Sequence, residues 1–272
     1  MSNFKVIFKN NILKLFLNKS GLKKYQRIYE ILFRLAIQGM NIGGGSDVYN
    51  SGESFAINYI KDKVHNNKEI IIFDVGANVG NWSQLVLKDF KEIDHQLFCF
   101  EPAKESFYQL KKNLDHHLNI KFYNFAFGAK NEAKSLFYDK ETSGLASIYN
   151  RQLAHFNIKL NLSQSIKVRT LDNFCEVNKI KKIDFLKIDV EGSELNVLKG
   201  AKKMIEDNKI QFIQFEFGGS NIDSRTYFQD FYYFLKDKYY IYRILKDGFY
   251  KILNYKEYYE LFLTTNFLAE HK

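Results

Sequence analysis

Short apolar runs alternate with amphipathic segments along the middle of this chain, and this alternation constrains the fold more than any other feature. The apolar runs are nearly continuous, which is typical of strands buried on both faces of a parallel sheet. They cover residues 69–76, 95–101, 120–128, 182–190 and 209–217. The segments with helical spacing between them cover residues 81–90, 103–114, 171–179 and 193–207. Strands separated by helices of this length predict an α/β fold with a doubly wound, mostly parallel sheet.

The N-terminal part of the chain departs from this alternation. An amphipathic helical pattern runs through residues 1–40, with an apolar side that includes Phe8, Ile12, Leu15 and Phe16. A glycine-rich loop follows at residues 41–53. We therefore expect a helical arm with its loop over residues 1–50 and a single domain over residues 51–272. The simpler interpretation is that the arm packs on this domain or on a second subunit of a homo-oligomer, and a peripheral contact with a membrane surface is the alternative.

Two further segments predict additional strands. Residues 131–168 contain two strand-like runs around a loop rich in Gly, Ser and Thr, which predicts an extra hairpin with a lid-like loop. The aromatic stretch at 239–253 and the run at 264–270 predict two more strands, antiparallel if a hairpin ends the sheet.

The composition argues against several classes of protein. The 272 residues are 46% hydrophobic and 26% charged, as in a folded globular protein. The two cysteines, Cys99 and Cys175, lack partners at metal-ligand spacing, which argues against a disulfide scaffold or a structural zinc site. No apolar run spans a bilayer, so we expect a cytoplasmic protein. The net charge of +9 comes mostly from lysine, which indicates a nucleic-acid partner less strongly than arginine would.

A glycine-containing turn follows the first predicted strand. The segment FDVGANVGN places Gly76 and Gly80 where a strand turns into a helix, which suits a tight turn and a close approach of the backbone to a ligand. Asp74 precedes the first glycine, and Asn78 stands where a dinucleotide-binding motif has its second glycine. The turn therefore predicts a site for a nucleotide-like cofactor other than a dinucleotide.

The ends of the second and third predicted strands extend this site. Glu101, 21 residues beyond Gly80, ends the second apolar run, where a carboxylate can accept hydrogen bonds from two ribose hydroxyls. The segment NFAFG ends the third run, where an adenine ring would rest against Phe127 and meet Asn124 or the backbone of Ala126. Phe127 fits a place in the hydrophobic core equally well.

The segment KIDVEGSE contains a pair of acids at the end of the fourth predicted strand. Asp189 and Glu191 are two residues apart, so their side chains leave the same face, and Gly192 permits the turn into the next helix. Glu216 ends the neighbouring fifth strand and is expected beside them. Three carboxylates in one cleft cannot all stay ionised without a counter-charge. We therefore predict Asp189, Glu191 and Glu216 as the catalytic acids, with Asp189 also bordering the cofactor.

Together these segments resemble the FkbM-type S-adenosylmethionine-dependent methyltransferases. The resemblance covers about residues 50–220 and rests on FDVGANVG, FEP, NFAFG, TLDNF at 170–174 and KIDVEGSELNVLKGA at 187–201. It implies a class I, Rossmann-like methyltransferase with a seven-stranded sheet and an antiparallel C-terminal strand. It also implies O-methylation, commonly of sugars in surface polysaccharides or of polyketides and related natural products.

The resemblance also assigns residues to the cofactor S-adenosylmethionine. It places the methionine part of the cofactor near the turn after the first strand, with Glu53 near the amino group, and the ribose near Glu101. Ser143 and Ser147 match a serine-rich loop of the family, although a solvated loop fits them equally well. The full set predicted for the cofactor is Glu53, Asp74, Gly76, Asn78, Gly80, Asn81, Glu101, Pro102, Asn124, Ala126, Phe127 and Asp189.

The predicted reaction is transfer of a methyl group to a hydroxyl of a carbohydrate or another small-molecule acceptor. A carboxylate that takes the hydroxyl proton is favoured over a divalent cation such as Mg²⁺. His155 is the outside candidate for a base among six histidines that otherwise suit the surface. An RNA methyltransferase is the alternative that the positive charge encourages, but no base-flipping or RNA-binding motif supports it.

Overall fold

The computed structural model describes residues 14, 17–45, 47–48 and 50–272. The chain forms two compact units, residues 1–42 and residues 43–272. In the first unit, a short 3₁₀ helix η1 (Lys23–Tyr25) leads into helix α2 (Gln26–Gly39). The apolar residues Phe8, Ile12, Leu15 and Phe16 of the predicted arm helix lie outside the described residues. In the part of the chain that is described, no helix has the length and apolar character needed to cross a membrane.

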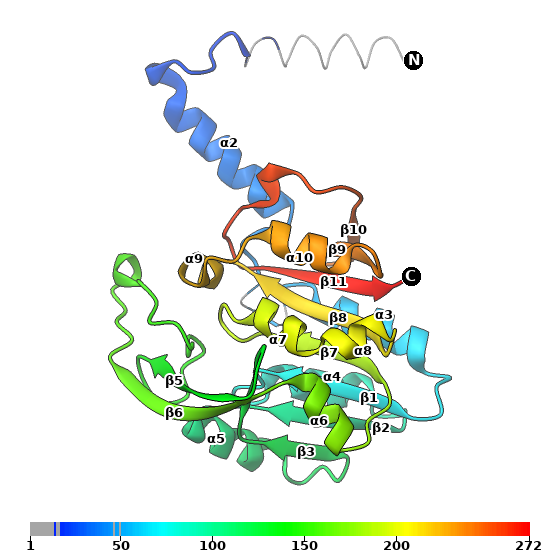
Figure 1. The fold of residues 1–272 in the computed structure, drawn as a ribbon. Helices are drawn as coiled ribbons and strands as arrows, with labels where there is room; N and C mark the ends of the chain where they lie inside the picture. Colours follow the sequence, from blue (N-terminus) through cyan, green and yellow to red (C-terminus); the bar gives the residue numbers. More distant parts are fainter. Residues whose placement is uncertain (1–13, 15–16, 46, 49) are drawn as a thin grey trace. The chain divides into compact units, whose positions relative to one another are not determined.

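The second unit is built on a mostly parallel sheet (Figure 1). Its strands are β1 (Ile70–Val75), β2 (His95–Phe100), β3 (Ile120–Tyr123), β7 (Ile183–Ile188), β8 (Ile210–Phe217), β9 (Tyr239–Leu245), β10 (Gly248–Ile252) and β11 (Thr265–His271). They lie in the order β10-β9-β11-β8-β7-β1-β2-β3. Strands β3, β2, β1, β7 and β8 are parallel, whereas β11 is antiparallel to both of its neighbours. The predicted doubly wound α/β fold is confirmed.

The predicted number of seven strands is wrong, because this sheet has eight. The stretch expected to form one strand at 239–253 turns at Lys246 and Asp247 and returns as β10, which pairs with β9 in a hairpin. Gly248 pairs with Leu245 at this turn, so the aromatic run supplies two strands. The polar pair Lys246 and Asp247, followed by Gly248, was the turn signal available in the sequence.

A smaller sheet holds the insertion between β3 and helix α6 (Leu171–Val177). It consists of β4 (Ala126–Phe127), β5 (Glu132–Tyr138) and β6 (Leu162–Arg169), in the order β4-β6-β5. The β5–β6 pair is the expected hairpin. The run predicted as one strand at 120–128 is divided between the two sheets, because the Asn124 side chain donates hydrogen bonds to the carbonyls of Glu101 and Pro102 and redirects the chain.

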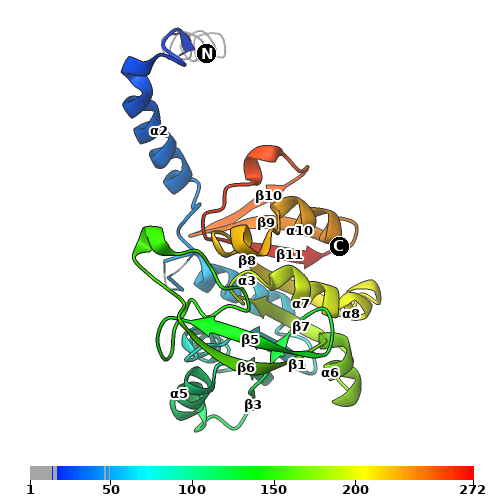
Figure 2. The ribbon, with the colours of Figure 1, turned by 60° about the vertical axis from the view of Figure 1, so that its left-hand side comes forward.

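Helices cover both faces of the large sheet (Figures 1 and 2). One hydrophobic core lies under α3 (Glu53–Val64), α4 (Asn81–Asp89) and α5 (Lys104–Leu114). The other lies under α6, α7 (Glu194–Gly200), α8 (Lys202–Glu206) and α10 (Phe228–Leu235). Three short helices, η2 (Ala154–Phe156), α9 (Ser220–Ser224) and η3 (Glu257–Tyr259), lie in the connections. Burial on both faces explains why the parallel strands read as continuous apolar runs.

Candidate active site

A pocket of about 290 Å³ opens at the carboxyl ends of β1, β2 and β7, where ligands bind in open α/β sheets. Its wall continues along β4 to β6 and onto residues 143–148 of the connection between β5 and β6. Eight of the predicted site residues line it: Gly76, Asn78, Glu101, Pro102, Ala126, Phe127, Asp189 and Glu191. The other predicted residues, Glu53, Asp74, Gly80, Asn81, Asn124 and Glu216, do not line it.

Gly76 allows the turn after β1 to pass close to the end of β7. Its φ is +84°, and a Cβ atom there would lie 1.7 Å from the carbonyl oxygen of Asp189. No residue with a side chain fits this position without displacing β7. The amides of Gly76 and Ala77 both donate to the carbonyl of Phe100, so the turn is also tied to β2. The floor of the pocket is therefore fixed by backbone contacts to both neighbouring strands.

Glu101 points into the pocket from the end of β2. One carboxylate oxygen accepts a hydrogen bond from the amide of Asn78 (2.9 Å) and the other from the amide of Ala103 (2.8 Å). Burial raises the pKa of this carboxyl to about 7, although the two backbone hydrogen bonds lower it. Each oxygen keeps a lone pair for a further donor, so the carboxylate is held ready to accept two hydroxyl hydrogen bonds.

Asp74 is fully buried behind the pocket rather than in its wall. Its oxygens contact the hydroxyl of Ser83 (2.7 Å) and the ammonium of Lys187 (3.2 Å). The same ammonium donates to the carbonyl of Gly76 (3.2 Å) and lies 3.4 Å from a carboxylate oxygen of Asp189. Asp74 therefore reaches the pocket through Lys187, a residue to which the sequence analysis gave no role.

Three other predicted residues lie outside the wall of the pocket. A Cβ atom on Gly80 would lie within 3 Å of Leu110 and Leu114, so this glycine lets α5 pack closely against the turn. Asn81 is exposed at the start of α4. Asn124 fixes the segment after Glu101 through its two hydrogen bonds to backbone carbonyls.

Five acids gather at the ends of β7 and β8 and at the start of α3. This acidic cluster consists of Glu53, Asp189, Glu191, Glu194 and Glu216. Burial, and then the charges of Asp189, Glu191, Glu194 and Glu53, raise the pKa of Glu216 well above its usual range. No hydrogen bond or ion pair to its carboxyl occurs among the described residues. In its protonated form this carboxyl is a potential hydrogen-bond donor.

Glu53 shares the cluster with a different set of partners. Its carboxylate accepts hydrogen bonds from Ser51 (2.9 Å) and Gln214 (2.6 Å). Burial raises its pKa to about 7, against the opposing effect of the Lys187 charge. No group of three or more His, Cys, Asp or Glu side chains in the described part of the chain is arranged to hold a metal ion.

Glu194 shapes the turn that carries Glu191. One of its oxygens accepts hydrogen bonds from the amides of Val190 (3.1 Å) and Gly192 (2.9 Å), and Asn221 donates to the other (3.3 Å). These contacts hold Glu191 in the left-handed conformation, with a φ of +55° that few side-chain-bearing residues adopt. Glu194 belongs to the segment KIDVEGSE, but no role was predicted for it. Its position in the first turn of a helix could have indicated that its carboxylate accepts hydrogen bonds from nearby backbone amides.

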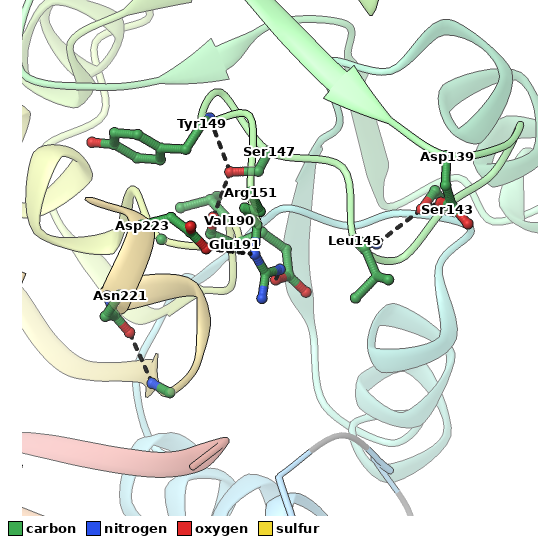
Figure 3. Close-up of polar contacts among 12 residues, drawn as sticks. Asp139, Ser143, Leu145, Ser147, Tyr149, Arg151, Val190, Glu191, Asn221 and Asp223 are labelled. Atoms are coloured by element: carbon green, nitrogen blue, oxygen red, sulfur yellow. Dashed lines mark hydrogen bonds and ion pairs between the residues drawn. The ribbon is translucent and has the colours of Figure 1, made fainter. Parts of the chain in front are cut away.

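Residues 139–161 connect β5 to β6, and four of them, Ser143, Gly144, Ala146 and Ile148, line the pocket. We call this segment the lid loop, and Figure 3 shows its polar contacts. Arg151 forms an ion pair with Glu191 and lies 3.5 Å from Asp223 on α9. The hydroxyl of Ser147 donates to the carbonyl of Glu191 (2.7 Å) and accepts from the amide of Tyr149 (3.1 Å). The lid loop is thus fastened to the turn after β7 through one residue, Glu191.

The remaining predicted residues of the lid loop have different surroundings. Ser143 lines the pocket, donates to Asp139 and accepts from the amide of Leu145. His155 is exposed on η2, stacks on Phe156 and does not line the pocket. Arg151 was missed because no periodic pattern in a long loop shows which distant residue a basic side chain will reach.

A family model for the methyltransferase FkbM domain matches residues 74–242, more than half of the chain. The chain belongs to the FkbM methyltransferase family. The matched range begins at Asp74 on β1 and ends within β9. It includes the pocket, the lid loop and all of the acidic cluster except Glu53. The resemblance noted from the sequence motifs is confirmed.

Two curated relatives and one solved structure show the range of likeness. The chain is 25% identical over 162 residues to the 2-O-methyltransferase NoeI of Sinorhizobium fredii, covering 56% of this chain and 65% of that protein. It is 24% identical over 150 residues to the hexuronic acid methyltransferase AglP of Haloferax volcanii, covering 54% and 56%. The crystal structure of a methyltransferase FkbM from Methylobacillus flagellatus superposes with a TM-score of 0.48 at 17% identity, covering 74% of this chain and 43% of that one. The chain spans less than two thirds of the length of the curated relatives it matches.

The raised pKa of Glu53 predicts a pH-dependent stability that Glu53→Gln removes. Because the folded pKa of about 7 lies above the usual 4.5, the folded state binds more protons between these values, and stability falls as pH rises through this window. We expect Glu53→Gln to gain about 2 to 3 kcal/mol relative to the wild type on going from pH 5 to pH 8. Denaturant unfolding at the two pH values measures this difference. The exposed Glu206→Gln is the matched control, and an equal pH dependence in wild type and Glu53→Gln would contradict the assignment.

Proposed function

We propose that this protein transfers the methyl group of S-adenosylmethionine to a hydroxyl of a carbohydrate, as an O-methyltransferase of polysaccharide biosynthesis. Membership of the FkbM methyltransferase family supports the methyl transfer. The names of two relatives, a 2-O-methyltransferase and a hexuronic acid methyltransferase, support a sugar hydroxyl as the acceptor. The observation that carries the proposal is the Glu101 carboxylate, which is fixed by two backbone amides with its remaining lone pairs available in the pocket.

The residues of the pocket fit this cofactor. Glu101 would accept hydrogen bonds from the two ribose hydroxyls, as an acid at the end of the second strand does in related nucleotide sites. Phe127 and Ala126 offer an apolar wall to the adenine ring. Gly76, Asn78 and Asp189 line the part of the pocket that would hold the methionine part of the cofactor. The cofactor supplies an electrophilic methyl group on a sulfonium centre.

Asp189 is the residue that we propose as the general base. Its side chain is 40% exposed, whereas that of its neighbour Glu191 is 19% exposed and ion-paired with Arg151. The ammonium of Lys187 lies 3.4 Å from the Asp189 carboxylate and compensates its charge. Asp189 is therefore the accessible carboxylate placed to take the acceptor proton. Glu216, in its protonated form, would donate a hydrogen bond to an acceptor oxygen and orient it.

The pKa of Glu101 predicts how cofactor affinity changes with pH. Ribose hydroxyls bind the ionised carboxylate, so affinity falls when Glu101 gains a proton below its pKa of about 7. We expect the affinity for S-adenosylmethionine to drop about tenfold from pH 8 to pH 6. Isothermal titration calorimetry at the two pH values measures it. Glu101→Gln should bind more weakly at pH 8 and lose most of this pH dependence, and a variant as pH-dependent as the wild type would contradict the ribose assignment.

Removing the charge of Asp189 tests the general base. Asp189→Asn keeps the side-chain shape, so we expect cofactor affinity to change little while turnover falls by about 10² to 10⁴. Asp207→Asn, at an exposed acid after α8, is the matched control and should keep full turnover. Full activity of Asp189→Asn would contradict the role. Treatment with EDTA distinguishes a general base from a divalent cation. If activity disappears with EDTA and returns with Mg²⁺ or Mn²⁺, the predicted catalytic acids are metal ligands instead.

The acceptor class is tested by following a labelled methyl group. We expect purified protein with labelled S-adenosylmethionine to label the polysaccharide precursors of the source cell and not its total RNA. A carbohydrate fraction whose hydroxyls have been chemically blocked is the control, because it should take up no label. Label found in RNA alone would contradict a carbohydrate acceptor and indicate that RNA is methylated instead.

A further inference from the structure

Helix α2 of the N-terminal unit separates its polar and apolar residues sharply. At 3.6 residues per turn, its polar residues fall within a sector of about 120°. They are Gln26, Arg27, Glu30, Arg34 and Gln38. Ile37 is the apolar residue inside that sector, and the remaining, wider side of the helix is apolar. This apolar side of α2 consists of Ile28, Tyr29, Ile31, Leu32, Phe33, Leu35 and Ala36.

Most of the apolar side of α2 is exposed, and Tyr29 is half-buried. No residue of the helix is buried, and the exposed fractions reach 51% for Ile31, 52% for Phe33 and 59% for Leu35. Contiguous apolar surface of this kind on a soluble protein marks a site of contact with another apolar phase. The helix is 14 residues long, about 21 Å, which is too short to span a bilayer but sufficient to lie along one.

The positive charge of the protein is concentrated in the part of the sequence that contains this helix. Residues 1–42 contain eight Lys and Arg residues and a single acid, Glu30, so they hold seven of the nine net charges of the chain. Lys23 and Lys24 directly precede the helix, and Arg27 and Arg34 lie on its polar side. Cations beside a wide apolar side are the combination found in helices that lie in the interface of an anionic membrane.

We propose that α2 binds an anionic lipid surface, with its apolar side among the acyl chains and its basic residues at the headgroups. RNA would engage the cations but leave the apolar side of α2 uncovered. A second copy of the helix would cover the apolar side but bring two strongly basic segments together. The lipid surface is the partner that satisfies both features at once. This inference is independent of the acceptor proposed above.

The test uses the full chain and vesicles of phosphatidylcholine with or without phosphatidylglycerol. In a flotation assay we expect the wild type to bind the vesicles that contain phosphatidylglycerol, with binding that weakens as salt is raised. Leu35→Glu and Gln38→Glu make the same change of charge on the apolar and the polar side. We expect binding to weaken about fiftyfold or more for Leu35→Glu, because the variant loses a leucine that would be buried in the membrane and gains a negative charge near anionic headgroups. For Gln38→Glu we expect a loss of about fivefold or less.

Three outcomes would overturn the proposal. The first is that the wild type fails to bind vesicles containing phosphatidylglycerol. The second is that Leu35→Glu and Gln38→Glu lose binding equally, which would leave only a nonspecific effect of charge. The third is that Leu35→Glu converts a wild-type dimer into a monomer in sedimentation velocity, which would make a second copy the partner of the apolar side. Circular dichroism of both variants verifies that their helical content matches the wild type.

Discussion

The candidate site depends on one buried cation, Lys187. Its ammonium lies between the carboxylates of Asp74 and Asp189 and donates to the carbonyl of Gly76. Burial lowers the pKa of a lysine, but the charges of Asp74, Asp189 and Glu53 outweigh this effect and raise it, so Lys187 stays charged. A single ammonium therefore joins β1, the turn after β1 and the end of β7. Its loss would leave Asp74 as an uncompensated buried charge, which costs several kcal/mol.

The charges around Lys187 divide the acidic cluster into different roles. Lys187 faces Asp189 and Arg151 faces Glu191, so these two carboxylates have a cation within contact distance. Glu216 has no such partner among the described residues, and burial and the surrounding acids raise its pKa well above the usual range. Glu194 accepts hydrogen bonds from backbone amides of the turn. The cluster thus presents one accessible carboxylate beside an acid with a raised pKa, which suits the proposed roles of taking a proton and orienting a hydroxyl.

Much of this arrangement is predictable from the sequence, because it follows local patterns. The continuous apolar runs predicted the parallel strands, and the position of Glu101 after the second run placed its carboxyl in the pocket. The roles of Lys187 and Arg151 were not predictable, because each depends on residues far away in the chain. Gly80 shows a related difficulty, since its motif predicts an approach to a ligand whereas the glycine meets α5. The extra strand β10 was missed although Asp247 and Gly248 interrupt the apolar pattern with a hairpin signal, because the whole stretch was predicted as one strand.

The distribution of charge bears on which acceptor suits the catalytic unit. Seven of the nine net positive charges belong to residues 1–42, so residues 43–272 have a net charge of only +2. The motifs of the methyltransferase domain lie entirely in this nearly balanced unit. The basic excess that encouraged an RNA acceptor therefore lies in the N-terminal segment of the sequence, and a net charge of +2 gives residues 43–272 little general attraction for a phosphate backbone. A neutral or sparsely charged acceptor such as a carbohydrate needs no such field, because hydrogen bonds and alignment can hold it in place.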